Sequence, residues 1–223
     1  MKFEKTEVWG FEHAIRGMRN PLESWKKSDS IILMEQDENN DFREVAKIGK
    51  NDLELMHKLI KAGSEHRKFL RQIFVAVDIT APLYWWKEAD TYKVGTVSNS
   101  TSTMHKLAST TITMDCFEMD DFADSNEESN HYNLYTKNMW SSLINHLEAL
   151  RKEFNETKDK RYWKELIRLL PESWLQKRTI TMNYENILNM YRHRKNHKLT
   201  EWSKAFCDWV KTLPYAEELI CLE

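Results

Sequence analysis

The chain has 223 residues, which is enough for one large domain or two small ones. Its 33 lysines and arginines nearly balance 35 aspartates and glutamates, and a net charge of −2 excludes general attraction to nucleic acid. No apolar stretch approaches the roughly 20 residues that a membrane helix needs, so we expect no membrane partner. Five glycines and four prolines form no linker, which favours a single domain over residues 1–223.

The cysteines indicate the compartment. Cys116, Cys207 and Cys221 are odd in number and widely spaced, and the sequence contains no CxxC pair. Closely paired cysteines are typical of metal sites and redox centres. The sequence therefore predicts a reduced, cytoplasmic protein.

The N-terminal elements are short. The sequence predicts a strand at Glu7–Gly10 and a helix at Phe11–Met18. Asn51 and Asp52 are residue types that cap helices, and an amphipathic helix is predicted to follow them over Leu53–Ala62.

A buried strand followed by a helix is predicted next. Ile73–Val77 is rich in β-branched and aromatic residues, which predicts the strand. Pro82 suits the first turn of a helix, where its missing N–H costs nothing. Gly95 and the polar run Ser98–Thr103 predict that this helix ends in a polar loop. Two acidic stretches predict a solvated turn and an irregular loop: Glu35–Asp41 and Cys116–Asn130.

The second half is more strongly helical. Apolar residues at helical spacing predict a long amphipathic helix over Tyr132–Asn155. A second helix over Lys160–Leu170 is predicted to stop at Pro171. Three more elements are predicted in order: a strand at Thr179–Met182, a helix capped by Asn183 and ending at Arg194, and a helix from Thr200 to Leu213. The fold class is α+β with helices predominating.

Two basic residues mark the helix before Pro171. Lys164 and Arg168 are four residues apart and share a helix face, and Leu169-Leu170-Pro171 follows them. Arginine suits phosphate recognition because its planar fork binds two oxygens at once. A solvated basic face is the ordinary alternative for such a pair, and both interpretations stay open.

Further motifs lie on both sides of this pair. Asn189 precedes Arg194 by five residues, and Glu65-His66-x-x-Phe69 precedes the buried strand and Ala81-Pro82. In this order the motifs resemble the core of the flavin-dependent thymidylate synthases, over roughly residues 51–213. The resemblance implies a helix-rich single domain with a small antiparallel sheet.

The resemblance also implies roles for the best matched residues. In that family, the arginines that match Arg168 and Arg194 hold the phosphate of dUMP. The residues that match His66 and Asn189 contact the flavin. Arg194 is therefore implied to be a catalytic and substrate-binding residue, and His66 and Asn189 are implied to bind FAD.

The segment after Ala81-Pro82 departs from the family pattern. Without gaps, the family's Arg-His-Arg falls on Thr91-Tyr92-Lys93, which implies that these residues contact FAD. The glutamine of the family's Arg-Gln pair falls on Glu88, which is implied to lie beside the uracil as a catalytic and substrate-binding residue. The family's Ser-x-Arg-Tyr falls on the stretch that starts with Thr101 and Ser102, which are implied to bind substrate, but its arginine is missing.

The family's activity is the first hypothesis. In that family FAD is reduced by NADPH, methylenetetrahydrofolate supplies the methylene group, and dUMP becomes dTMP. Family members are homotetramers, so self-association is implied here. The second hypothesis is a flavin- or nucleotide-binding paralogue that has lost the reaction, because Thr91-Tyr92-Lys93 is altered. The third is a helical interaction or nucleic-acid-associated protein, against which the near-neutral charge argues.

One pair of histidines has the spacing of metal ligands on a helix. His193 and His197 are four residues apart and could face the same ion. Catalytic zinc sites usually have a third protein ligand, and the glutamate of His-Glu-x-x-His is absent from this pair. We therefore expect no metal here. The same helix spells Arg192-His193-Arg194, which we interpret as a coincidence.

Overall fold

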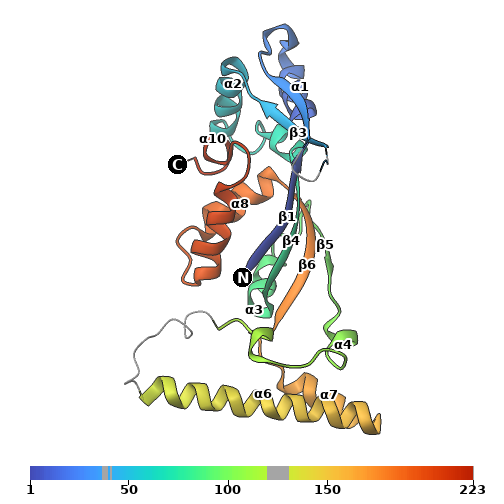
Figure 1. Cartoon of the computed structure of the whole chain (residues 1–223). Helices are drawn as coiled ribbons and strands as arrows, with labels where there is room; N and C mark the ends of the chain where they lie inside the picture. The colour runs from blue at the N-terminus through green and yellow to red at the C-terminus, as the bar shows by residue number, and fades with distance from the viewer. Residues whose placement is uncertain (37–39, 41, 120–130, 223) are drawn as a thin grey trace. The chain divides into compact units, whose positions relative to one another are not determined.

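The structure is a computed structural model that describes residues 1–36, 40, 42–119 and 131–222 (Figure 1). The chain is α+β and rich in helix, as expected. Its four-stranded sheet has the order β1-β4-β6-β5. These strands are β1 (Lys2–Trp9), β4 (Phe74–Pro82), β6 (Leu175–Asn183) and β5 (Val97–Ser100).

Strand β4 contributes a fully buried face to the core. Val75, Val77 and Ile79 are buried and alternate with partly exposed residues. Successive side chains of a strand point to opposite faces, so this alternation places every second residue in the core. The strand predicted at Ile73–Val77 is confirmed and continues to Pro82, which ends β4 and directly precedes helix α3 (Leu83–Ala89).

The chain divides into two compact units. Unit 1 contains Met1, Thr80–Asp90 and Asn99–Arg178, and unit 2 contains Lys2–Ile79, Thr91–Ser98 and Thr179–Glu223. Strands β4, β5 and β6 have residues in both units. That these units form one domain stays a prediction.

Unit 1 contains the longest helix. Besides α3 it has α4 (Thr103–Lys106), the short 3-10 helix η4 (Met114–Cys116), α6 (His131–Thr157) and α7 (Lys160–Leu169). Both long helices were predicted within about two residues of these bounds, so the amphipathic periodicity is confirmed. Asp159 begins α7 by accepting a hydrogen bond from the backbone N–H of Arg161 at 2.9 Å.

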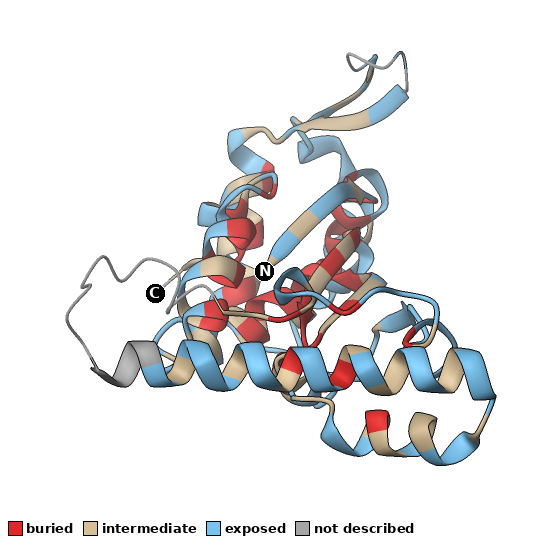
Figure 2. Ribbon diagram, turned by 60° about the horizontal axis from the view of Figure 1, so that its bottom comes forward, coloured by how far each residue is buried: buried red, intermediate tan, exposed pale blue. Residues whose placement is uncertain are grey.

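The core of unit 1 lies along the second half of α6. Ile144 and Leu147 are its buried residues there, and most of the remaining helix surface is exposed or intermediate (Figure 2). They pack with buried side chains from the rest of the unit: Leu107, Ile112, Phe117, Leu166 and Trp174.

Unit 2 begins with α1 (Phe11–Arg19), two short 3-10 helices, η1 (Asn20–Leu22) and η2 (Trp25–Lys27), and the hairpin β2 (Ile31–Gln36) and β3 (Phe42–Lys47). Then come α2 (Lys50–Lys61) and the 3-10 helix η3 (Lys68–Gln72). After β6 follow α8 (Tyr184–Arg194), the π-helix η5 (Glu201–Phe206), α9 (Cys207–Lys211) and α10 (Ala216–Leu219).

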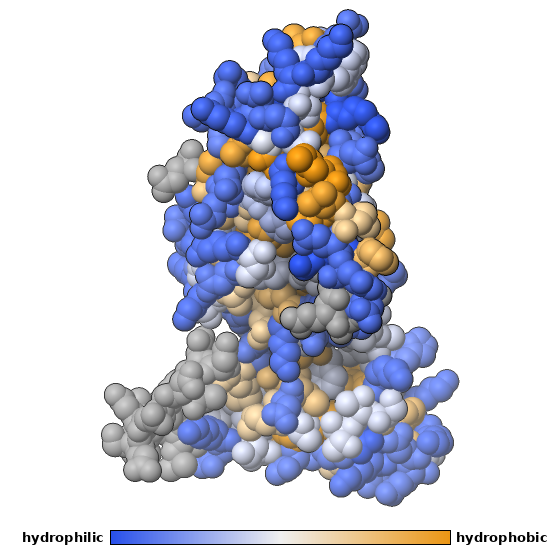
Figure 3. Space-filling model, turned by 45° about the horizontal axis from the view of Figure 1, so that its top comes forward, coloured by the Kyte–Doolittle hydropathy of each residue, from blue (hydrophilic) through white to orange (hydrophobic). Residues whose placement is uncertain are grey.

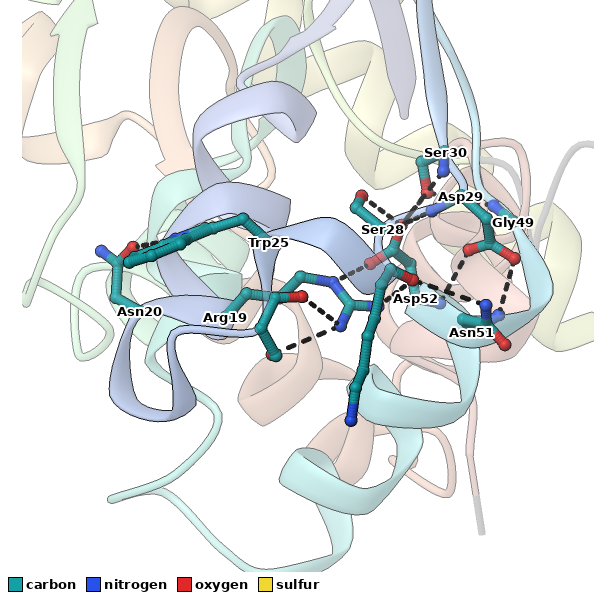
Figure 4. Close-up of polar contacts among 11 residues, drawn as sticks. Arg19, Asn20, Trp25, Ser28, Asp29, Ser30, Gly49, Asn51 and Asp52 are labelled. Carbon is teal, nitrogen blue, oxygen red and sulfur yellow. Dashed lines mark hydrogen bonds and ion pairs between the residues drawn. The ribbon is translucent and has the colours of Figure 1, made fainter.

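A buried ion pair joins α1 to α2 in unit 2 (Figure 4). The guanidinium of Arg19 donates from Nε to Oδ1 of Asp52 at 2.6 Å, and both side chains are almost completely buried. Oδ2 of Asp52 accepts hydrogen bonds from Ser28 and Ser30 hydroxyls and from the N–H groups of Asp29 and Ser30. Burial alone would raise the pKa of Asp52, but these bonds, with that of Arg19, outweigh burial and lower its pKa.

The hairpin β2–β3 is antiparallel and carries apolar side chains on its surface. Ile31, Met34 and Phe42 are 59, 63 and 70% exposed. On the face that Figure 3 shows, apolar patches interrupt a mostly hydrophilic surface.

Two expectations for local structure are wrong. The predicted polar loop at Ser98–Thr103 contains strand β5 and the start of α4. All four residues of β5 are exposed, three of them are polar, and β5 is an edge strand, so no apolar pattern marks it. Asn51 and Asp52 do not cap α2, which begins at Lys50 after Gly49. The last main helix starts after Thr200, as predicted; it begins as a π-helix and ends at Lys211, two residues before the predicted end.

The two acidic stretches divide between described and undescribed residues. Glu35 and Gln36 belong to β2, and positions 37–39 and 41 lie outside the described residues. Cys116 ends η4, and positions 120–130 also lie outside them. Among the helices that the structure describes, none combines the length and apolar character needed to cross a membrane.

Candidate functional site

Helix α8 carries the predicted residues Asn189 and Arg194, and its start is firmly fixed. It follows β6 without a connecting loop (Figure 1). The side chain of Asn183 accepts from the N–H of Asn186 at 3.0 Å, and that of Asn186 accepts from the N–H of Asn183 at 3.1 Å. This reciprocal capping satisfies two N–H groups at the helix start. The predicted cap at Asn183 and the helix end at Arg194 are confirmed.

A buried arginine joins the loop after α2 to the first half of α8. Arg67 donates from Nε to Glu185 at 3.1 Å and from Nη2 to the side-chain oxygen of Asn189 at 3.2 Å. Arg71, which is half-exposed, donates to the other carboxylate oxygen of Glu185. Burial would raise the pKa of Glu185, but the bonds from Arg71 and Arg67 outweigh it and lower that pKa. Glu185 therefore stays ionised, and the position of Asn189 is tied to Arg67.

The altered segment Thr91–Thr96 is attached to the start of the same helix. The side-chain amide of Asn186 donates to the backbone oxygen of Val94 at 2.5 Å. The hydroxyl of Thr96 donates to the backbone oxygens of Tyr92 and Lys93 at 3.0 and 3.1 Å. These bonds close the segment into a tight turn beside the capping pair.

Gly95 makes this close approach feasible. Its φ is +77°, and a Cβ at this position would lie 3.0 Å from Nδ2 of Asn183. We expect Gly95→Ala to lower the free energy of unfolding by about 2 kcal/mol, from backbone strain together with the contact. Gly63→Ala is the matched control, because φ is +107° there and a Cβ would meet nothing within 4 Å. Urea unfolding measures both variants, and equal losses would contradict a role for the contact with Asn183.

The end of α8 meets the same segment through aromatic rings. Arg194 donates from Nε to the hydroxyl of Tyr92 at 3.1 Å. Its guanidinium carbon lies 4.8 Å from the centre of the Trp202 ring and 5.5 Å from that of the Tyr92 ring. The rings of Tyr92 and Trp202 are 6.4 Å apart. Three predicted site residues, Asn189, Tyr92 and Arg194, therefore lie along one helix of unit 2.

Solved structures match the fold of the chain. No protein-family model matches the chain, and no curated protein matches it. Among solved structures, the flavin-dependent thymidylate synthase ThyX of Helicobacter pylori, complexed with FAD and dUMP, aligns over 100% of both chains with a TM-score of 0.65 and 17% identity. The chain has the fold of the flavin-dependent thymidylate synthases. A second structure of the Helicobacter pylori enzyme with FAD and dUMP gives the same TM-score and identity, covering 99% of this chain and 97% of that one.

The remaining residues predicted for the thymidylate synthase site in unit 2 are exposed. His66 lies in the turn that Gly63 begins, directly before Arg67, and its ring is at the surface. Thr91 and Lys93 are exposed on either side of Tyr92. Within the described residues, no hydrogen bond or ion pair engages the Lys93 ammonium group.

Unit 1 holds the other four predicted residues of the thymidylate synthase site. Glu88 lies on α3 and is partly exposed, next to Lys87, which pairs with Glu172 at 2.5 Å. The backbone N–H of Thr101 donates to Lys177, and the hydroxyl of Ser102 begins α4 by accepting from the N–H of His105. Arg168 is exposed on α7 and pairs with Glu165 at 3.0 Å. Their roles stay predictions.

Sequence reasoning missed three residues of this arrangement: Arg67, Glu185 and Trp202. Arg67 directly follows the predicted His66 in the same turn, and Arg67 is buried whereas His66 is exposed. Glu185 and Trp202 are buried, and no spacing in the sequence marks their partners. A charged residue in the first turn of a predicted helix was the available signal for Glu185.

Two further kinds of chemistry were considered for the described residues, a reactive thiol and a bound metal ion. Burial, the largest cause, raises the pKa of the Cys207 thiol to about 11, so it is not an activated nucleophile. Among the described residues, no group of three or more His, Cys, Asp or Glu side chains is arranged to hold a metal ion.

Proposed function

We propose that this chain is a flavin-dependent thymidylate synthase that binds FAD and methylates dUMP to dTMP. In this proposal NADPH reduces the FAD, and methylenetetrahydrofolate supplies the carbon. One observation carries it: residues from three distant segments, which the resemblance had linked to flavin and nucleotide, lie along helix α8. His66 directly precedes Arg67, which donates to Asn189, and Arg194 donates to Tyr92.

The residues along α8 suit FAD. Lys93 offers an exposed ammonium group without an ion-pair partner among the described residues, and a pyrophosphate needs such a cation. His66 is exposed and can contact the flavin. Arg67, which follows His66 in the chain, donates a hydrogen bond to Asn189. FAD, when bound, supplies the hydride-transfer chemistry. The protein residues contribute binding, orientation and charge.

Substrate binding uses arginines in this proposal. Arg194 and Arg168 hold the phosphate of dUMP, Thr101 and Ser102 contact the substrate, and Glu88 lies beside the uracil. Arg168 is exposed, and its partner Glu165 is on the surface of the same helix, so a phosphate can displace that pair at little cost. In this proposal the active enzyme is a cytoplasmic homotetramer.

A second function is favoured by a specific observation. The Nε of Arg194 and the side-chain oxygen of Asn189 are both engaged by other residues of the protein. A flavin- or nucleotide-binding paralogue without the synthase reaction needs only the exposed groups, such as Lys93 and His66.

Absorbance spectroscopy tests the proposal. Purified protein is mixed with FAD, the flavin band is recorded, dUMP is titrated, and dTMP is then assayed with methylenetetrahydrofolate and NADPH. We expect a bound flavin whose band shifts with dUMP, followed by dTMP formation. Lys93→Met should weaken FAD binding by about 5- to 10-fold, because a charge-assisted contact is lost, whereas Lys195→Met, an exposed lysine just after α8, should not.

The outcomes separate the two functions. Flavin binding with a dUMP-dependent shift but no dTMP would support the paralogue and contradict the synthase. A protein that binds no FAD would overturn the synthase, and one that binds neither FAD nor dUMP would overturn both.

A further inference from the structure

The guanidinium of Arg194 contacts two aromatic residues, Tyr92 and Trp202. Its Nε bonds to the hydroxyl of Tyr92 at 3.1 Å, and it lies over the rings of Trp202 and Tyr92 at 4.8 and 5.5 Å. A cation over aromatic rings is attracted by their π-electrons, and this attraction orients the planar group. Trp202 is completely buried, so its ring is a fixed surface.

The segment that contains Tyr92 contacts both the first and the last turn of α8. The Thr96 hydroxyl bonds to the backbone oxygen of Tyr92, and Asn186 in the first turn of α8 bonds to Val94. The Tyr92 ring also lies 6.3 Å from that of His193 in the last turn of the helix. These contacts hold the Tyr92 segment against α8 in the absence of a ligand, and the phenol oxygen accepts the hydrogen bond from Nε of Arg194.

We propose that Tyr92 is a positioning residue that sets the orientation of Arg194 for the phosphate of a nucleotide. This inference rests on the proposed function, in which Arg194 binds that phosphate. Bidentate recognition of phosphate requires the guanidinium plane to match the oxygens, so an arginine free to rotate binds less well. Tyr92 occupies the position that the resemblance aligns with the family's histidine. The proposal therefore assigns a role to this difference from the family pattern.

Removal of the phenol oxygen tests the inference. In FAD-loaded protein, the dissociation constants of dUMP and deoxyuridine are measured by calorimetry for the wild type and Tyr92→Phe. The variant keeps the ring but loses the hydrogen bond. We expect dUMP to bind about 5- to 10-fold more weakly, from the loss of a bond to a charged group, and deoxyuridine to change by less than about 2-fold. Tyr135→Phe, an exposed tyrosine of α6, is the control that leaves both constants unchanged.

A double-mutant cycle shows whether the effect acts through Arg194. We expect Tyr92→Phe to have no further effect on dUMP affinity in an Arg194→Gln background, because interacting residues are not additive. An equal loss for dUMP and deoxyuridine, or full additivity with Arg194→Gln, would indicate a general structural effect and overturn the inference.

The failures of the two proposals are distinct. A wild type that binds dUMP no better than deoxyuridine would remove phosphate recognition, and with it both the proposed role of Arg194 and the inference. A wild type that prefers dUMP, with a Tyr92→Phe variant that keeps the full preference, would overturn the inference alone.

Discussion

Asp52→Ala is expected to lower the free energy of unfolding by about 3–5 kcal/mol, because it leaves the buried Arg19 without its counter-charge. Arg19 and Asp52 have 4 and 0% of their side chains exposed, so water cannot replace the lost partner. The substitution also removes the acceptor of four hydrogen bonds from the stretch that leads into β2. Urea unfolding followed by circular dichroism measures the effect.

Glu54→Ala is the matched control for Asp52. Glu54 lies two residues further along α2, is exposed, and has no ion pair among the described residues. We expect its replacement to change the free energy of unfolding by less than about 0.5 kcal/mol. A loss below about 1 kcal/mol for Asp52→Ala would show that the buried pair contributes little.

The pH dependence of stability provides a second check on Asp52. Its pKa is lowered in the folded protein, so its stabilising effect is fully present above the ordinary aspartate pKa of about 3.9. The effect is lost as the pH falls through the lowered pKa. The difference in unfolding free energy between the wild type and Asp52→Asn should therefore be large at neutral pH and shrink below about pH 4. A difference that stays constant across this range would contradict the ionised pair.

Arg67→Met is expected to lower the free energy of unfolding by about 3 kcal/mol, because it leaves the buried carboxylate of Glu185 with one exposed partner. Arg67 has 10% of its side chain exposed and Glu185 8%. Arg71→Met, which removes the other arginine from the same carboxylate, should cost about 1 kcal/mol or less, because its side chain is 51% exposed and solvent screens the pair. Urea unfolding of both variants gives the comparison, and equal losses would contradict the difference in burial.

Regular periodicity and local caps made much of the fold predictable. Helices α6 and α7 show their amphipathic spacing in the sequence. Asn183 caps the start of α8 by accepting a hydrogen bond from the N–H of Asn186, three residues further along the chain. Strand β5 was not predictable because its four residues are exposed and its partner β6 lies far along the chain. Asp52 has the residue type of a cap, and only the tertiary contact with Arg19 shows its actual place.

The candidate site was predictable as a set of segments but not as a set of contacts. Asn189, Arg194 and Tyr92 were singled out from the resemblance. Their partners Arg67, Tyr92 and Trp202 follow from tertiary packing, since 122 residues separate Arg67 from Asn189 and 102 separate Tyr92 from Arg194. No local spacing in the sequence records such pairs. His66 was singled out by its motif, whereas only the fold reveals the burial of Arg67 and its bond to Asn189.

The composition of unit 2 from three separate stretches has a consequence for synthesis. Arg67 leaves the ribosome 118 residues before Glu185, its partner. Translation proceeds from the N-terminus at about 5–20 residues per second, so Arg67 waits for several seconds without its carboxylate. The pair Arg19–Asp52, only 33 residues apart, can form early in that interval. A nascent chain that stops before α8 can thus contain the Arg19–Asp52 pair between α1 and α2. The part of the candidate site on α8 can form only after that helix has been made.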